Sequence, residues 1–377
     1  MMPRRKPAPV NLAPGLGSVI GVLALLVLLP ACRSKVFRHS GAVNVGGEMK
    51  VSGKFDVDDL GELATAIRLQ DSHSKPLRAI RVGPPKPASL HTSKKIAVID
   101  VDGLLVDRVM GGGLAASGEN PVALFREKLD QVRSDRSIGA VVLRLNSPGG
   151  GVTASDMMCH ELMRLKQERQ LPIIASLGVV GAGGAYYLAN HCDAIVAQPT
   201  SVVGGIGVIL NTYNLEDTMG QFNILGVPIK SGEQIDAGSP QRPLEDNELE
   251  MLQGIADSFH QRLIDQVTST RPQLLVSGDR WKEGQVMTGQ QAADLGLVDT
   301  VGYLDTAITL AEGQVGAQES LDVVLYRRED QQAYTPLDST PNAARMQSLL
   351  PIHVPGLSRS EMPTFLYMWQ PDPQMAN

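Results

Sequence analysis

Ala140-Val141-Val142-Leu143-Arg144-Leu145-Asn146-Ser147-Pro148-Gly149-Gly150-Gly151 is the stretch that decides the fold. Its first six residues form a nearly continuous apolar run, which is typical of a strand buried on both faces of a parallel sheet. A turn of small residues follows, and Thr153-Ala154-Ser155-Asp156 then has the pattern of a capping box that opens a helix. The stretch therefore predicts a strand, a tight turn and a helix.

The same rhythm continues on both sides of this stretch. Apolar runs of similar length cover residues 96–101, 171–177 and 193–197. Asn120-Pro121 supplies an N-cap and a first helical residue, and apolar side chains follow it at helical spacing. A longer helical pattern covers residues 244–267. Alternating strands and helices predict an α/β fold with right-handed crossovers.

The glycine turns also suggest chemistry. The turn at residues 147–151 leaves a strand and enters a helix, so its backbone N–H groups lie near the positive end of the helix dipole. A second small-residue turn, at 181–185, follows the next strand and also opens a helix. Donors in such turns suit an oxyanion hole, which binds a carbonyl oxygen as it gains charge. A tight connection that simply requires small residues is the alternative reading.

Several segments together carry a resemblance to a known family. In chain order they are Asn146-Ser147-Pro148-Gly149-Gly150-Gly151, Gly181-Ala182-Gly183-Gly184-Ala185-Tyr186-Tyr187, Gly204-Gly205-Ile206-Gly207-Val208, Lys230-Ser231-Gly232 and Gly296-Leu297-Val298-Asp299. Over residues 94–311 the chain resembles the signal peptide peptidase A family, membrane-associated serine peptidases with a Ser-Lys dyad. The resemblance implies a Clp protease/crotonase-like α/β fold of stacked ββα units. It also implies assembly into rings or domes and cleavage of residual signal peptides.

The resemblance assigns the site as follows. Gly149 and Gly150 occupy the oxyanion loop, and Gly184 follows the nucleophile position. Gly183 stands at the nucleophile position and Ile235 at the position of the lysine base. We expect the three oxyanion glycines to converge on one pocket, with Gly183 and Ile235 facing each other across it.

A shift of the alignment does not restore the dyad. No serine occurs between residues 177 and 200, and Lys230 is the only lysine between residues 167 and 281. Glycine cannot attack a carbonyl, and isoleucine cannot accept a proton. We therefore expect a catalytically silent family member. Its partners would be extended hydrophobic peptides or signal peptides, and it would form a homo-oligomer or a hetero-oligomer with an active paralogue.

Two other functions stay open at this point. A displaced nucleophile, Ser201, Thr200 or Ser147, could be activated by Lys230 or His191, although exposed turn hydroxyls are more often helix or turn caps. Acyl-thioester chemistry of the crotonase type would use an oxyanion hole without a serine, but an exported protein would meet little coenzyme A. We expect no cofactor.

The first 32 residues have the features of a lipoprotein signal peptide. A basic start precedes an apolar run at residues 19–29, which is too short to span a bilayer as a helix. The run ends in Leu29-Pro30-Ala31-Cys32, which resembles a lipobox, so we expect Cys32 to be lipidated. The predicted location is the bacterial cell envelope, with the exported chain held on a membrane by its lipid.

The mature chain divides into three predicted regions. Residues 33–93 are expected to form a membrane-proximal linker with a small β element near residues 48–57. Residues 94–323 should form the peptidase-like domain. Residues 324–377 are rich in proline, methionine and polar residues, and we expect a largely irregular tail there.

Composition excludes other classes of function. The net charge is −6 and aromatic residues make up 4% of the chain, which argues against nucleic-acid binding. The histidines that adjoin Cys159 and Cys192 do not have metal-ligand spacing, so no metal site is predicted. We expect both cysteines to be unpaired and Cys159 to be buried.

Overall fold

The computed structural model describes residues 39–45, 49–55, 75–83, 94–108, 119–276, 278–329, 331–339 and 364–369. The chain forms two compact units, residues 1–72 and residues 73–377. In the first unit, β1 (His39–Val45) and β2 (Met49–Phe55) form an antiparallel hairpin. The strand β2 lies within residues 48–57, where a small β element was expected, and β1 precedes that segment. The predicted signal peptide and Cys32 lie outside the described residues.

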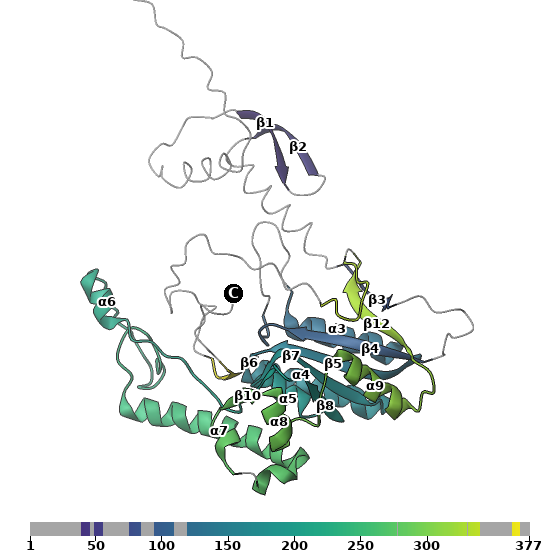
Figure 1. The fold of residues 1–377 in the computed structure, drawn as a ribbon. Coiled ribbons are helices and arrows are strands. Elements are labelled where there is room, and N and C mark those ends of the chain that lie inside the picture. Colours follow the sequence, from purple (N-terminus) through teal and green to yellow (C-terminus); the bar gives the residue numbers. More distant parts are fainter. Residues whose placement is uncertain are drawn as a thin grey trace, which may run out of the picture. The chain divides into compact units, whose positions relative to one another are not determined.

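A nine-stranded sheet forms the centre of the second unit within its described residues (Figure 1). The strand order is β10-β9-β7-β5-β4-β12-β3, and β8 pairs with β7 and β11 beside this path. Pairing is parallel from β9 through β12 and antiparallel at the two outer strands. The strands are β3 (Leu77–Val82), β4 (Lys95–Asp102), β5 (Ile138–Ser147), β7 (Ile173–Ala182), β8 (Ala194–Ala197), β9 (Val202–Gly204), β10 (Val286–Thr288), β11 (Thr300–Val301) and β12 (Asp322–Arg328).

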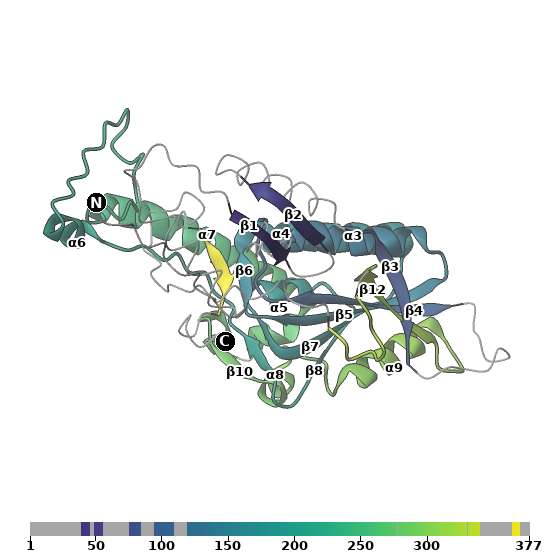
Figure 2. The ribbon, with the colours of Figure 1, turned by 90° about the horizontal axis from the view of Figure 1, so that it is seen from above.

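Helices cover both faces of this sheet, as Figure 2 shows for α3 and α4 on one side and α9 on the other. Alternate residues of β4 and β5 therefore enter two separate apolar cores. The helices are α3 (Pro121–Ser134), α4 (Val152–Arg169), α5 (Gly184–Ala189), α6 (Glu216–Gln221), α7 (Asp246–Thr270), α8 (Gly289–Leu295) and α9 (Leu304–Val315), with short 3-10 helices at Pro272–Val276 and Arg280–Lys282. The predicted α/β class with a parallel sheet is confirmed.

The predicted N-terminus of α3 is also confirmed. The side-chain oxygen of Asn120 accepts hydrogen bonds from the backbone N–H groups of Val122 and Ala123, at 2.9 and 3.2 Å. Pro121 occupies the first turn, where its missing N–H costs nothing.

The predicted capping box of α4 is wrong. The helix begins earlier, at Val152, and Gly151 precedes it without a side-chain cap. The N–H of Val152 instead donates to the carbonyl oxygen of Phe365, at 3.1 Å. A distant segment of the chain therefore supplies the cap that a local side chain was expected to provide.

The predicted domain boundary at residue 323 is corrected by β12, which spans Asp322–Arg328 and lies between β4 and β3. The strand β3 falls within the region predicted as a linker. Near the C-terminus, β13 (Leu366–Met368) pairs with β6 (Gly149–Gly151). The predicted irregular tail thus contributes residues to two strands, β12 and β13.

Buried charges connect β12 to the rest of the sheet. The carboxylate of Asp100 accepts from Arg144 at 2.7 Å and forms an ion pair with Arg327 at 2.8 Å. Arg144 also donates to the carbonyl oxygens of Pro336 and Asp338, at 2.7 and 2.6 Å. These bonds hold residues 336–338 against β5, since each buried charge needs a partner.

Among the helices of the described residues, none combines the length and the apolar character needed to cross a bilayer.

Lys128 generates a prediction on stability. Its ammonium is buried and donates to the Asp100 carbonyl oxygen at 3.1 Å; burial lowers its pKa to about 8, against the opposing effect of Asp100. Between this pKa and its unfolded value the unfolded chain binds more protons, so the free energy of unfolding should rise with pH. Lys128→Met should remove this rise, roughly 3 kcal/mol between pH 7.5 and 10.5. Urea unfolding across that range measures it.

The matched control is Lys94→Met, which changes an exposed lysine. It should retain the pH dependence of the unmodified chain. Identical pH profiles for Lys128→Met and the unmodified chain would show that burial does not perturb Lys128.

Candidate peptide-binding site

Three glycine turns meet at the carboxyl end of the central strands. The N–H of Gly183 donates to the carbonyl oxygen of Gly204 at 3.0 Å. A Cβ built on Gly149 would lie 2.7 Å from the backbone nitrogen of Gly184. The structure thus brings together the predicted nucleophile position and the predicted oxyanion glycines.

Gly183 connects β7 directly to α5 and has φ +53° and ψ −121°. Residues that carry a Cβ rarely adopt a positive φ, so glycine suits this turn. In α/β-hydrolases the nucleophile sits in a similarly strained strand-to-helix turn, which projects its side chain out of the sheet. Here that position has no side chain.

A strand from the C-terminal part of the chain lies over these glycines (Figure 2). Antiparallel pairing places Leu366 opposite Gly151, Tyr367 opposite Gly150 and Met368 opposite Gly149. On its other side, Leu366 exchanges two backbone hydrogen bonds with Ile209, at 2.9 and 3.0 Å. We call the position between β6 and Ile209 the strand slot.

The carbonyl group of Tyr367 lies at the centre of the glycine cluster. The Val152–Phe365 and Trp369–Pro148 hydrogen bonds, at 3.1 and 2.9 Å, flank it two residues away on each side. Hydrogen-bonded and non-hydrogen-bonded pairs alternate along an antiparallel ladder. Since these two flanking pairs are hydrogen-bonded, the pair midway between them, Gly150 and Tyr367, is hydrogen-bonded as well. A Cβ on Gly183 would lie 2.3 Å from the Tyr367 oxygen, closer than real contacts allow.

The side chain of Tyr367 is held from the other direction. It is 1% exposed, and its hydroxyl donates to the carbonyl oxygen of Phe259 in α7 at 2.8 Å. Its ring centroid lies 5.6 Å from that of Tyr187, and the Phe365 and Phe259 rings meet edge to face at 5.4 Å. The sequence predictions did not include Phe259 or Tyr367, because only the fold brings α7 and β13 together.

The two predicted oxyanion-loop glycines differ in their hydrogen bonds. The N–H of Gly149 donates to the hydroxyl oxygen of Ser147 at 3.0 Å, within its own turn. Gly150 instead forms the hydrogen-bonded pair with Tyr367 of β13. An amide already bonded in its own turn cannot also bind a carbonyl oxygen well, so Gly150 is the better placed donor.

Ile235 lies apart from this cluster in the single chain. It is 74% exposed, in the segment between α6 and α7. Arg242 ties this segment to the start of α7 through Asp236 at 3.1 Å and Glu248 at 2.9 Å. Glu248 lies roughly 16 Å along α7 from Phe259, given a rise of 1.5 Å per residue. The expected apposition of Ile235 and Gly183 is therefore not found among the described residues.

Lys230 shares this exposed segment. Its ammonium forms an ion pair with Asp236 at 2.8 Å. Hydrogen bonds from Arg242 and Lys230 hold the pKa of Asp236 below its usual range. Lys230 is thus positioned to neutralise the carboxylate of Asp236 beside it.

The alternative nucleophiles have structural roles. The Ser201 hydroxyl donates to the carbonyl oxygens of Leu177 and Gly178, and Ser147 bonds within its turn. The ring nitrogens of His191 contact the Tyr187 carbonyl oxygen at 2.8 Å and the Gln266 side chain at 3.1 Å. In the part of the chain that the structure describes, neither hydroxyl is hydrogen-bonded to His191 or Lys230.

Ser155 was not predicted as a site residue. It is fully buried in α4, its hydroxyl has no hydrogen-bond partner among the described residues, and its oxygen would lie 2.2 Å from a Cβ on Gly184. Its local pattern indicated only a capping box, and the contact with Gly184 depends on the packing of α4 against α5.

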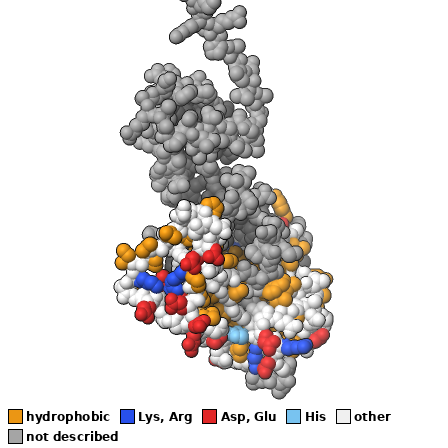
Figure 3. Space-filling model, turned by 90° about the vertical axis from the view of Figure 1, so that its left-hand side faces the viewer, with side chains coloured by type: hydrophobic (Ala, Val, Ile, Leu, Met, Phe, Trp, Pro, Cys, Tyr) orange, Lys and Arg blue, Asp and Glu red, His pale blue; other side chains and the backbone are white. Residues whose placement is uncertain are grey.

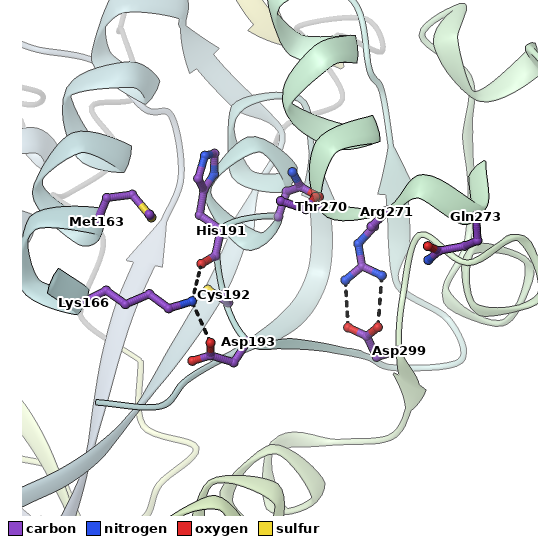
Figure 4. Close-up of a pocket in the computed structure, with 10 residues that line it drawn as sticks. Met163, Lys166, His191, Cys192, Asp193, Thr270, Arg271, Gln273 and Asp299 are labelled. Atoms are coloured by element: carbon purple, nitrogen blue, oxygen red, sulfur yellow. Dashed lines mark hydrogen bonds and ion pairs between the residues drawn. The ribbon is translucent and has the colours of Figure 1, made fainter. Parts of the chain in front are cut away.

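A polar cavity of about 280 Å³ lies elsewhere, beside α4, α5 and the end of α7 (Figure 4). Its charged side chains pair with one another: Lys166 with Asp193 at 2.7 Å, and Arg271 with Asp299 at 2.8 Å. Burial raises the pKa of the neighbouring Cys192 thiol. These pairs tie helices to strand ends, so the charges of the cavity stabilise the fold.

The cysteine predictions agree with the structure. Cys159 and Cys192 are both free thiols, and Cys159 is buried. Burial raises the pKa of Cys159 to about 12, so its reactive thiolate is scarce. Within the described residues, no three His, Cys, Asp or Glu side chains are grouped to hold a metal.

Residues 165–318 match Peptidase family S49. The chain is 32% identical over 221 residues to a putative protease of Synechocystis, covering 59% of this chain and 74% of that protein. The chain belongs to the signal peptide peptidase A family. It is also 32% identical to the chloroplastic serine protease SPPA of Arabidopsis thaliana, over 58% of this chain but only 32% of that protein. The putative signal peptide peptidase SppA of Enterococcus faecium is 28% identical, over 58% of this chain and 62% of its own length.

Among solved structures, the chain is similar to a mutant of the 1510-N membrane-bound stomatin-specific protease in complex with a substrate peptide. The TM-score is 0.40 at 13% identity, and the match covers 62% of this chain and 91% of that one.

Gly149 tests the close approach of β13. Its φ is +106°, and an added Cβ would lie 1.9 Å from the Tyr367 carbonyl oxygen. Gly149→Ala should lower the free energy of unfolding by about 2 kcal/mol or more, through backbone strain and loss of the strand pairing. Gly254→Ala is the control, because its added Cβ meets no atom within 4 Å in the middle of α7. It should stabilise the chain by about 1 kcal/mol. Urea unfolding compares them, and equal effects would contradict the packing described.

Proposed function

We propose that this chain is a catalytically silent member of its family, which binds extended hydrophobic peptides in the strand slot. The observation that supports it best is β13 itself. An extended backbone lies along Gly149–Gly151, with its Tyr367 carbonyl over Gly183, a residue that has no side chain to attack it. Adding a strand to an exposed edge is a common way of binding peptides, in which backbone hydrogen bonds give affinity and side-chain pockets give specificity.

The chemistry of the two assigned positions supports inactivity. Gly183 offers no nucleophile, and Ile235 offers no base. In subtilisin, loss of the nucleophile or the histidine base alone costs about 2 × 10⁶ in kcat. A family member that lacks both groups retains only binding and oxyanion contacts.

An exposed apolar surface supports the proposed assembly with other copies or with an active paralogue. Between α6 and α7, five large apolar side chains besides that of Ile235 are more than half exposed; Figure 3 views this side of the molecule. They are Phe222, Ile224, Leu225, Val227 and Ile229. Contiguous exposed apolar patches commonly mark protein interfaces.

Inactivity is tested by labelling the purified chain with a serine-reactive fluorophosphonate. We expect no labelling, and no detectable hydrolysis of peptide esters, because Gly183 has no hydroxyl and, within the described ranges, neither Ser147 nor Ser201 is hydrogen-bonded to Lys230 or His191. An active serine peptidase serves as the control for the probe. Labelling that disappears in Ser155→Ala, Ser201→Ala or Ser147→Ala would establish a displaced nucleophile and refute the proposal.

The proposed location is the bacterial cell envelope, with Cys32 as the lipid attachment site. Cys32→Ser should abolish incorporation of labelled fatty acid and either release the chain from membranes or leave its signal uncleaved. Metabolic labelling with fractionation measures both. Normal membrane retention together with normal maturation would rule out the lipoprotein assignment.

A further inference from the structure

We propose that residues 364–369 are a tethered ligand that fills the strand slot, and that the slot selects extended peptides with aromatic residues at alternate positions. This inference rests on the peptide binding proposed above. It adds the class of peptide recognised and a competition between the chain's own tail and any other peptide.

The backbone of the tail is held on both sides. Toward the sheet, Phe365 and Trp369 bond to Val152 and Pro148, and Leu366 bonds twice to Ile209 on the opposite side. A peptide with contacts on both edges is a strand inserted between two chain segments. Backbone contacts alone do not select a sequence.

Selection comes from alternate side chains. In an extended strand, residues i, i+2 and i+4 point to the same face, so Phe365, Tyr367 and Trp369 share one side. Phe365 meets Phe259, and Tyr367 is enclosed between Tyr187 and the Phe259 carbonyl group. The Cβ of Trp369 would lie 3.1 Å from a Cβ on Gly205. The three side chains on this face thus lie against aromatic side chains or against a glycine.

The depth of insertion depends on missing side chains. Built on Gly149 and Gly183, a Cβ would lie 1.9 and 2.3 Å from the Tyr367 oxygen. The tail can therefore approach the slot more closely than it could approach a site with a serine at position 183. The glycine assigned to the nucleophile position is the feature that lets a strand settle there.

Occupancy of the slot also completes the fold. The first N–H of α4 is capped by the Phe365 carbonyl oxygen, with no side-chain cap available. If the tail leaves, this N–H and the backbone groups of β6 need another partner. An incoming peptide that replaces the tail would restore the same bonds, so exchange of one strand for another is favoured over an empty slot.

The test uses full-length protein and a fluorescein-labelled peptide with the sequence of residues 364–369, Thr-Phe-Leu-Tyr-Met-Trp. In the unmodified chain the tail competes at a high effective concentration, so binding of the free peptide should be weak. Tyr367→Asp places a charge in the buried position and should release the tail. Fluorescence anisotropy should then show at least about 10-fold tighter binding than in the unmodified chain.

The control variant is Thr364→Asp, which adds the same charge to the same tail at an exposed position and should bind like the unmodified chain. A control peptide, Thr-Leu-Phe-Tyr-Trp-Met, keeps the composition but makes the aromatics consecutive. It should bind Tyr367→Asp at least about 10-fold more weakly than the matching peptide does, because only alternate residues share a face.

Hydrogen exchange checks that Tyr367→Asp remains folded. The amide protons of Val152 and Ile209 should exchange at least about 10-fold faster in this variant, while those of β4 and β5 stay unchanged. Equal peptide affinity for the unmodified chain and Tyr367→Asp would overturn the tethered ligand and leave peptide binding intact. Equal binding of both peptides would overturn the aromatic selectivity. Binding of neither peptide to any variant would overturn the proposed function as well.

Discussion

The backbone groups of Gly149–Gly151 are the constraint on which the site depends. Three consecutive glycines form β6. They have no side chains that could cover their backbone N–H and C=O groups or form hydrogen bonds with them. Buried backbone groups without partners are strongly unfavourable, so an edge of this kind requires another strand. The isolated bridge from Leu105 satisfies one side, and β13 satisfies the other. The need for a pairing strand therefore explains both the position of the tail and the binding mode proposed for peptides.

The sheet that presents this edge is held together by charge pairs as well as by apolar packing. Asp100 joins two arginines from different strands, and Arg328 reaches Glu119 at 2.6 Å and Glu127 at 2.8 Å. A buried pair adds little net stability over apolar packing, but removal of one partner is costly. These pairs consequently fix the register of β12 between β3 and β4. The sheet held in this way presents the glycine turns at the carboxyl ends of β5 and β7.

The sequence predicted the parts of the fold whose stabilisation is local or repeats along the chain. Continuous apolar runs identified β4, β5, β7 and β8, and Asn120-Pro121 identified the start of α3. The strand β12 was missed because its arginines resemble surface residues until distant carboxylates are known to pair with them. The strand β13 has only three residues, and its partner strand β6 lies more than 200 residues earlier. No local pattern can report such pairing.

The glycine turns were predicted from their spacing, and the structure gathers them, but it also changes what their combination means. At position 183, the proposed nucleophile position, the absence of a side chain leaves space for a carbonyl group. A serine there would place its Cβ 2.3 Å from the Tyr367 oxygen, so the observed tail position and a catalytic serine exclude each other in this geometry. In the assignment proposed, loss of catalysis and close binding of a strand arise from the same missing atoms. Under the proposed function, the slot would hold a peptide at the position where an active relative would cleave it.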